Sequence, residues 1–198
     1  MAFVAVLAWI AGAAVAASLG LWAGMGMTAV VVGLGVLATR WQALRELLRP
    51  RPKPILIGLA AGLLLVLATH LSYAPISAVA PFVKTGTAQL YLENASRPRL
   101  AFGLLLLPIA IAEEVVWRGA VQAALTARFG TAVAVLAGAA LYAVCHAPIG
   151  APVLMIAALG CGLVWGVLRA TTAGLVAPIL AHVLWDEILL FIAPLTTR

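Results

Sequence analysis

The stretch 100–128, LAFGLLLLPIAIAEEVVWRGAVQAALTAR, decides how the chain folds. It is a long apolar run in which two adjacent carboxylates, Glu113 and Glu114, lie near the middle and Arg118 follows. A hydrocarbon layer of ~30 Å is crossed by about 20 helical residues. The run therefore predicts a membrane-spanning helix that carries charges inside the membrane.

The rest of the chain has the same apolar character. Of its 198 residues, 65% are hydrophobic and 9% are charged, against about 45–50% and about 25% in soluble proteins. So few charges exclude a soluble globule, and the high hydrophobic fraction excludes disorder. We expect an all-α, polytopic transmembrane helix bundle of about seven helices (range six to eight), a single membrane-embedded domain over 1–198 with a motif-bearing core at about 100–190. The apolar runs are 2–19, 22–39, 55–80, 100–127, 131–149, 151–169 and 174–195.

The connections between the runs predict the orientation. Residues 40–53 carry five positive charges and one Glu, which places this connection in the cytoplasm by the positive-inside rule. The net charge of +6 is therefore interpreted as a topology signal, and nucleic acid is not expected as a partner. Run 2–19 lacks a preceding positive charge, so we interpret it as a retained span rather than a signal peptide. Residues 82–99 are expected to form a polar loop on the outer side.

Small residues and cysteines in the runs are expected to serve packing. Two cysteines, Cys145 and Cys161, lie in apolar runs without the spacing of a zinc site, which predicts small buried side chains. Glycines four residues apart allow helix backbones to approach closely. Such pairs occur at Gly20/Gly24, Gly58/Gly62 and Gly162/Gly166.

Charged and polar residues inside the spans are the candidates for function, because a charge near the bilayer centre costs roughly 2.5–3.5 kcal/mol. Glu114 and Arg118 are four residues apart with Glu first, the favourable order for an ion pair. Glu113 points about 100° away and is predicted to face a polar cavity. The alternative is that these three residues form a packing ion cluster. The full set is Glu113, Glu114, Arg118, His146, His182, Asp186 and Glu187, with His70 and Tyr142 as lesser candidates.

Two further clusters have helical spacing. Tyr142 and His146 share a helix face, and so do His182 and Asp186, which could form a hydrogen-bonded pair or two metal ligands. Pro108 and Pro178 precede the polar residues and predict bends that open a water pocket, although proline is also frequent in membrane helices.

Together the three clusters supply a general base, a second proton carrier and groups that can stabilise an oxyanion. These are the requirements for adding activated water to a carbonyl. The GxSxG and HExxH motifs are absent from the sequence, which argues against serine-type and soluble zinc-protease chemistry. A proton-coupled membrane transporter and a non-catalytic immunity or scaffold protein of the same fold are the alternatives.

EEVVWRG at 113–119 resembles the EExxxR motif of the CAAX protease and bacteriocin-processing (Abi-like, CAAX prenyl protease 2) family. His146 is similar to the end of the family's FxxxH motif, with Tyr142 in place of Phe. HVLWD at 182–186 resembles the HxxxN or HxxxD motif, and LVAPILAH at 175–182 is similar to the run that precedes it. The resemblance covers about 100–190 and implies an intramembrane endopeptidase.

The resemblance also implies roles for the site residues. Glu113 and His146 would prepare the attacking water, His182 and Asp186 would bind the carbonyl oxygen, and the residues Glu114 and Arg118 would support the site. An ionised Asp cannot donate a hydrogen bond, so Asp186 is either protonated, orients His182, or binds metal. The family is discussed as glutamic or metal-dependent; no cofactor is assigned, and a divalent metal such as zinc is left open.

The expected partners are the lipid bilayer and a membrane-anchored protein or peptide, cut near its C-terminal or membrane-proximal region. The composition, rich in Ala, Leu and Arg and poor in Lys, is typical of a GC-rich bacterial genome. We therefore expect a multi-pass protein of the bacterial cytoplasmic (inner) membrane, for which a prenylated substrate is not favoured.

Overall fold

The computed structural model describes residues 2–95 and 98–195, and all regular structure in this part of the chain is helical. The predicted all-α bundle of about seven helices (range six to eight) is confirmed. The elements are α1 (Ala2–Leu19), α2 (Leu21–Leu47), α3 (Pro52–Val79), α4 (Pro81–Ala95), α5 (Arg99–Glu114), the π-helical η1 (Val115–Val121), α6 (Gln122–Phe129), α7 (Thr131–Val144), the 3₁₀ turn η2 (Ala147–Ile149), α8 (Pro152–Thr172), α9 (Val176–Asp186) and the π-helical η3 (Glu187–Ile192).

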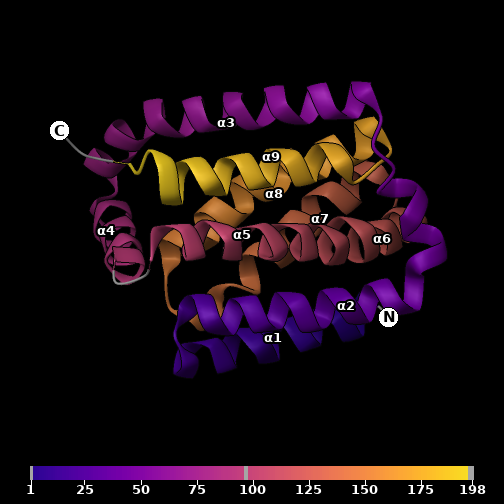
Figure 1. Cartoon of the computed structure of the whole chain (residues 1–198), viewed down its shortest axis with the longest axis horizontal. Helices are drawn as coiled ribbons and strands as arrows, with labels where there is room; N and C mark the ends of the chain where they lie inside the picture. Colours follow the sequence, from indigo (N-terminus) through magenta and orange to yellow (C-terminus); the bar gives the residue numbers. More distant parts are fainter. Residues whose placement is uncertain (1, 96–97, 196–198) are drawn as a thin grey trace.

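Most helices run along the long axis of the molecule (Figure 1). The α1–α2 pair lies on one side, α3 packs on α9 at the other, and α5, η1 and α6 form one continuous rod between them. The short helix α4 closes one end. Five helical stretches are long and apolar enough to cross a membrane, so the chain is an integral membrane protein: Leu21–Leu47, Pro52–Val79, Leu100–Phe129, Thr131–Ile149 and Pro152–Thr172.

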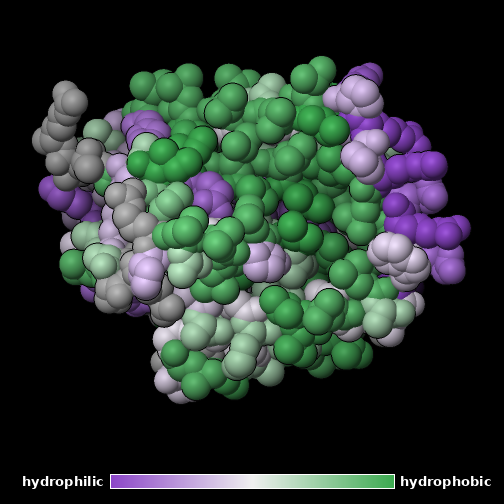
Figure 2. All heavy atoms as spheres, in the orientation of Figure 1, coloured by the Kyte–Doolittle hydropathy of each residue, from purple (hydrophilic) through white to green (hydrophobic). Residues whose placement is uncertain are grey.

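The surface separates by polarity along the same axis. Figure 2 shows hydrophobic residues over most of one face and a hydrophilic edge at the end where α2 meets α3. This edge holds the basic residues of 40–53. The bundle thus has one strongly basic end, as the positive-inside pattern of the sequence predicts.

The connection at 40–53 is shorter than predicted. Helix α2 continues through Arg40, where the backbone kinks (φ −128°, ψ 18°), and ends at Leu47. The segment 41–47 consists mostly of good helix formers, and Leu44 is buried where it meets Gly119. Burial of Leu44 therefore extends the helix into the basic segment.

The polar loop predicted at 82–99 is wrong for most of its length, because Pro81–Ala95 forms helix α4. Val83, Thr87 and Leu90 are buried and lie four and three residues apart, which is one face of a helix. This face packs against α3 and α8. The short amphipathic pattern was hidden by the polar residues of the other face.

The glycine pairs behave differently from one another. Gly58 and Gly62 lie against α9, and Gly162 lies against Ala139 of α7, so close that a Cβ would meet neighbouring atoms. Gly20 does not pack: it has open space around it and a φ of +86°, and it separates α1 from α2. The packing role predicted for Gly20 is therefore wrong, and its freedom at positive φ serves the turn.

The predicted proline bend at Pro178 is also absent. Pro178 is the third residue of α9, where its missing N–H removes no intrahelical hydrogen bond. Pro108 lies inside α5. The irregularity beside the carboxylates is instead the π-helical segment η1, which starts directly after Glu114.

Candidate active site

Two of the motifs, EExxxR and HxxxD, contain carboxylates that lie where an α-helix passes into a π-helix. α5 passes into the π-helical η1 after Glu114, and α9 passes into the π-helical η3 after Asp186. A π-helical turn re-aims the side chains around it and occurs frequently at functional sites. The carboxylates Glu114 and Asp186 thus each lie directly before a π-helical segment.

Glu114 and Arg118 form the ion pair that their spacing predicts. The Arg118 Nη1 donates to Oε1 of Glu114 at 3.1 Å, and Nη2 donates to the carbonyl oxygen of Gly162 at 3.1 Å. The guanidinium also lies 4.9 Å from the centre of the Tyr142 ring and 5.2 Å from that of Trp165. Both charged side chains are fully enclosed, with 2% of Arg118 and none of Glu114 exposed.

Glu113 is directed toward Tyr142 and not toward Arg118. The hydroxyl of Tyr142 donates a hydrogen bond to its Oε2. Glu113 lines a chamber of about 350 Å³ together with His146, His182 and Asp186. The predicted polar cavity lined by Glu113, His146 and His182 is therefore present, and Tyr142 finds the glutamate partner that its hydroxyl needs.

His182 lies among three carboxylates. Its Nδ1 is 2.9 Å from Oε1 of Glu114, and its Nε2 is 3.4 Å from Oδ2 of Asp186 and 3.9 Å from Oε2 of Glu113. Carboxylate oxygens accept hydrogen bonds, so Nδ1 carries a proton toward Glu114. The ring also stacks on Trp165, at 3.7 Å between centroids and 16° between planes. His182 is thereby fixed in position and orientation.

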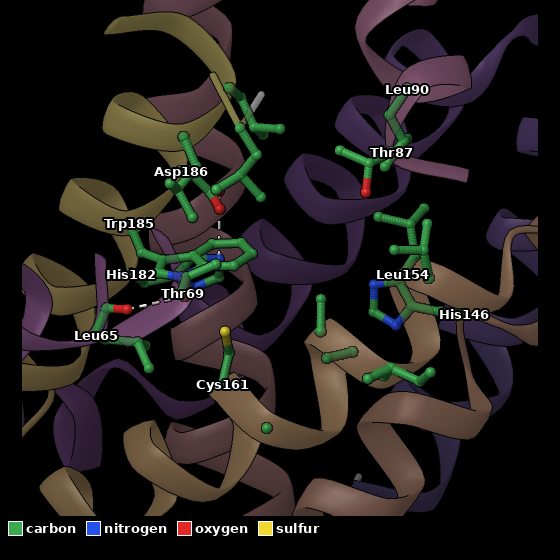
Figure 3. Close-up of a pocket in the computed structure, with 18 of the residues that line it drawn as sticks. Leu65, Thr69, Thr87, Leu90, His146, Leu154, Cys161, His182, Trp185 and Asp186 are labelled. Atoms are coloured by element: carbon green, nitrogen blue, oxygen red, sulfur yellow. Dashed lines mark hydrogen bonds and ion pairs between the residues drawn. The ribbon is translucent and has the colours of Figure 1, made fainter. Parts of the chain in front are cut away.

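His146 lies across the chamber from His182 and Asp186 (Figure 3). Its Nδ1 is 2.7 Å from the carbonyl oxygen of Tyr142. Because a carbonyl only accepts, Nδ1 carries the proton of the neutral imidazole and Nε2 keeps its lone pair. The imidazole lies edge to face against the Tyr142 ring, at 4.7 Å between centroids. His146 thus has one nitrogen held by the protein and one free to accept a proton.

The structure brings the six candidate residues together from four helical segments. Glu113, Glu114 and Arg118 come from α5 and η1, His146 follows α7, and His182 and Asp186 come from α9. All six are buried. His70 is exposed on α3 and does not join them, and Glu187 is directed toward Gly103 on α5.

Both cysteines are buried and free, as predicted. Cys161 lines the chamber and Cys145 does not.

Sequence reasoning missed one partner of the cluster, Trp165, which stacks on His182. It also missed the buried Gln122, which donates from Nε2 to the carbonyl oxygen of Gly166 at 2.9 Å outside the cluster. An aromatic side chain in an apolar run is typical of a core residue, so Trp165 carried no signal of its own. The Gly162/Gly166 pair was the usable signal, since closely approaching backbones expose carbonyl oxygens to neighbouring donors.

The donor geometry does not fit a metal ion. Within 2–95 and 98–195, no group of three or more His, Cys, Asp or Glu side chains is placed to hold one. Nδ1 of His182 is engaged by Glu114, and His146 lies on the opposite wall.

The fold and this cluster describe an integral membrane protein with buried acidic and basic side chains inside a helical bundle. Comparison with protein families gives the particular class: the family described as type II CAAX prenyl endopeptidase Rce1-like matches residues 95–188. The matched segment is just under half of the chain and contains the three motifs on which the resemblance was based. The match to an endopeptidase family suggests a peptidase. No curated protein and no solved structure matches the chain.

Proposed function

We propose that the protein is an intramembrane endopeptidase that hydrolyses a peptide bond with water activated by Glu113 and His146. The substrate is a membrane-associated protein or peptide, cut near its C-terminal or membrane-proximal region. The observation that carries this proposal is the division of labour between the paired glutamates. Glu114 is engaged by Arg118 and His182, while Glu113 is held by Tyr142 and faces the chamber.

In the first step, Glu113 takes a proton from a water molecule in the chamber. Nε2 of His146 accepts a hydrogen bond from the second O–H of this water, and Tyr142 keeps the Glu113 carboxylate in place. The water oxygen then bonds to the carbonyl carbon of the scissile peptide. General-base assistance of this kind contributes typically 10²–10⁴-fold to a rate.

His182 stabilises the negative charge that forms on the carbonyl oxygen. Its Nε2 lies nearest the chamber carboxylates, 3.4 Å from Asp186 and 3.9 Å from Glu113. Of the roles open to Asp186, orientation of His182 is the one this distance favours. When the C–N bond breaks, the amine nitrogen takes the proton from Glu113, and the two products are a carboxylic acid and an amine.

Glu114, which is paired with Arg118, holds the Nδ1 side of His182 in position. Glu114 accepts from both Arg118 and His182 through one oxygen, Oε1. In metal sites, removing a group that orients a ligating histidine lowers metal affinity or activity about 10–100-fold. We expect a loss of activity on a similar scale here. The same residues therefore support both fold and chemistry.

The composition of the chain supports the bacterial cytoplasmic (inner) membrane as its location. The substrate would meet the enzyme within that bilayer as an anchored protein or peptide. Its identity is to be read from the products.

In the test, purified protein in liposomes is given a library of membrane-anchored peptides. Mass spectrometry then identifies the new termini that cleavage produces. We expect wild type to produce defined products, and Glu113→Gln to produce at least 100-fold less. A chelator should leave the wild-type rate unchanged, because no three-donor metal site is formed by the described residues. Unchanged cleavage by Glu113→Gln would refute the proposed base, and loss of activity with chelator that zinc restores would refute the metal-free mechanism.

A further inference from the structure

The chamber lies toward one end of the bundle. Its walls come from the start of α2, the second half of α3, the helix α4, the end of α7, the first half of α8 and the second half of α9. Because α2 and α8 begin, and α3 and α7 end, at the same end of the bundle, these segments all lie there (Figure 1). The chamber thus reaches from Glu113 toward the end that α4 covers.

Most of the basic residues lie at the opposite end, whereas Lys84 and Arg99 lie at the chamber end. The α8–α9 turn joins the α2–α3 turn there, since the backbone N–H of Leu175 donates to the carbonyl oxygen of Leu47 at 2.8 Å. Arg128 ends α6 and Arg169 ends α8 at this same end. With the five positive charges of 40–53, the positive-inside rule assigns this end to the cytoplasm. The chamber therefore faces the extracytoplasmic side.

We propose that the substrate reaches Glu113 from the extracytoplasmic side, past α4, and is an uncharged, apolar segment of a peptide on the outer face of the membrane. This inference rests on the proposed function, since it names the substrate class of the same site. The position of the chamber indicates the side of the membrane from which the substrate enters. The walls of the chamber indicate that the bound segment is apolar.

The walls select an apolar segment. Among the described residues that line the chamber, the carboxylates and imidazoles belong to four side chains, Glu113, His146, His182 and Asp186. The outer part is apolar apart from hydroxyl groups, such as those of Thr87 and Ser72. Among the described residues of this outer part, a charged side chain would meet no counter-ion, whereas a hydroxyl can pair with a peptide group. A volume of about 350 Å³ suits a short stretch of chain.

Helix α4 is the wall that the segment must pass. It turns Val83, Thr87 and Leu90 inward and leaves Lys84 exposed. Figure 3 shows Thr87 and Leu90 on the chamber side, near His146. The hydroxyl of Tyr91, also on α4, donates to the carbonyl oxygen of Leu189 at 3.0 Å and accepts from the N–H of Leu195 at 2.9 Å. These bonds join α4 to η3 and to the segment that follows it, which continue from the α9 helix of His182.

The access route is tested by labelling, which does not depend on catalysis. In a Cys145→Ala, Cys161→Ala background, Thr87→Cys is treated with a membrane-impermeant thiol reagent in intact spheroplasts and in inverted vesicles. We expect Thr87→Cys to react from the outer side at least tenfold faster than from the inner side. Lys84→Cys should show the same side preference, and Arg45→Cys, exposed at the basic end, should show the reverse.

Ser72→Cys, on the chamber wall of α3, serves as the second probe if Thr87→Cys does not fold. Faster labelling of the chamber probes from the inner side would overturn the access route. Labelling from neither side would also overturn it, because the chamber would then be closed to solutes at this end.

The substrate class is tested with two matched anchored reporters, one displaying an apolar segment on the outer face and one displaying it on the inner face. We expect wild type to cleave the outer reporter at least tenfold faster, a Lys inserted in the segment to abolish this cleavage, and Glu113→Gln to cleave neither. Cleavage of the inner reporter alone would overturn the inference while leaving the proposed function intact. Cleavage of neither by wild type would remove the proposed function and the substrate class with it, and the labelling result would still decide the access route.

Discussion

The two adjacent glutamates of the α5–η1 rod hold their charges in different surroundings. Glu114 belongs to the ionic core, defined as Glu114, Arg118 and His182, in which protein groups bind one another at 2.9–3.1 Å. Glu113 belongs to the chamber floor, defined as Glu113, Tyr142 and His146, where Glu113 and His146 face open space, and Nε2 of His182 links the two groups at 3.9 Å from Glu113. The comparison shows that a charge inside a membrane protein serves the structure when protein groups are its partners. It is available for chemistry when it faces an open chamber.

The chamber floor is expected to affect rate far more than stability. Replacing His146 by Ala removes the imidazole nitrogen that faces the chamber, and we expect the cleavage rate to fall 10²–10⁴-fold. Steady-state cleavage of the library-derived substrate measures this change. The neighbouring Cys145→Ala is the control, since Cys145 does not line the chamber; equal activity of the two variants would contradict the role of His146.

The ionic core is expected to affect stability first. Removing one partner of a buried ion pair leaves the other charge unpaired, so Arg118→Met should lower the free energy of unfolding by about 3–5 kcal/mol. Denaturant unfolding in detergent measures this loss. Arg49→Met breaks the exposed Arg49–Glu46 pair at 3.3 Å and should cost about 1 kcal/mol or less. Similar losses in both variants would show that burial does not distinguish the two pairs.

Asp186 lies where the ionic core meets the chamber and should give an intermediate result. Asp186→Ala removes the partner of His182 Nε2 and should lower the cleavage rate about 10–100-fold. Asp186→Asn keeps an oxygen that can accept from Nε2 and should retain more of the rate than Ala does. If Asn proves as inactive as Ala, the carboxylate charge is required, and orientation alone does not explain this residue.

The smallest effect is expected from Tyr142→Phe, which removes one hydrogen bond to Glu113 and leaves the ring in place. A buried hydrogen bond contributes about 0.5–1.5 kcal/mol, so the rate should fall up to about tenfold. Comparing kcat with KM locates the effect, because a residue that positions Glu113 should change kcat. A change confined to KM would instead indicate that Tyr142 contacts the substrate.

Local spacing predicted much of this arrangement. Glu114 and Arg118 could be paired because residues four apart share a helix face, and Glu113 could be assigned different partners because adjacent helical residues point about 100° apart. The apolar runs predicted the bundle because the length of a span is set by the bilayer. These are properties of single helices, which the sequence specifies directly.

Contacts between distant segments could not be derived in this way. Glu114 and His182 are 68 residues apart, and Arg118 and Gly162 are 44 apart, so their contacts depend on how the helices pack. Residue type did not separate Trp165 from other core aromatics, and the polar face of α4 concealed Val83, Thr87 and Leu90. Nor did spacing indicate that η1 and η3 would be π-helical.

The paired variants Glu113→Gln and Glu114→Gln, measured for cleavage and for unfolding in the same preparation, test the central claim most directly. We expect Glu113→Gln to unfold within about 1 kcal/mol of wild type and to cleave at least 100-fold more slowly, and Glu114→Gln to lose about 3–5 kcal/mol of stability. Wild-type cleavage by folded Glu113→Gln, or the same loss of stability in both variants, would contradict the division of labour between the two glutamates.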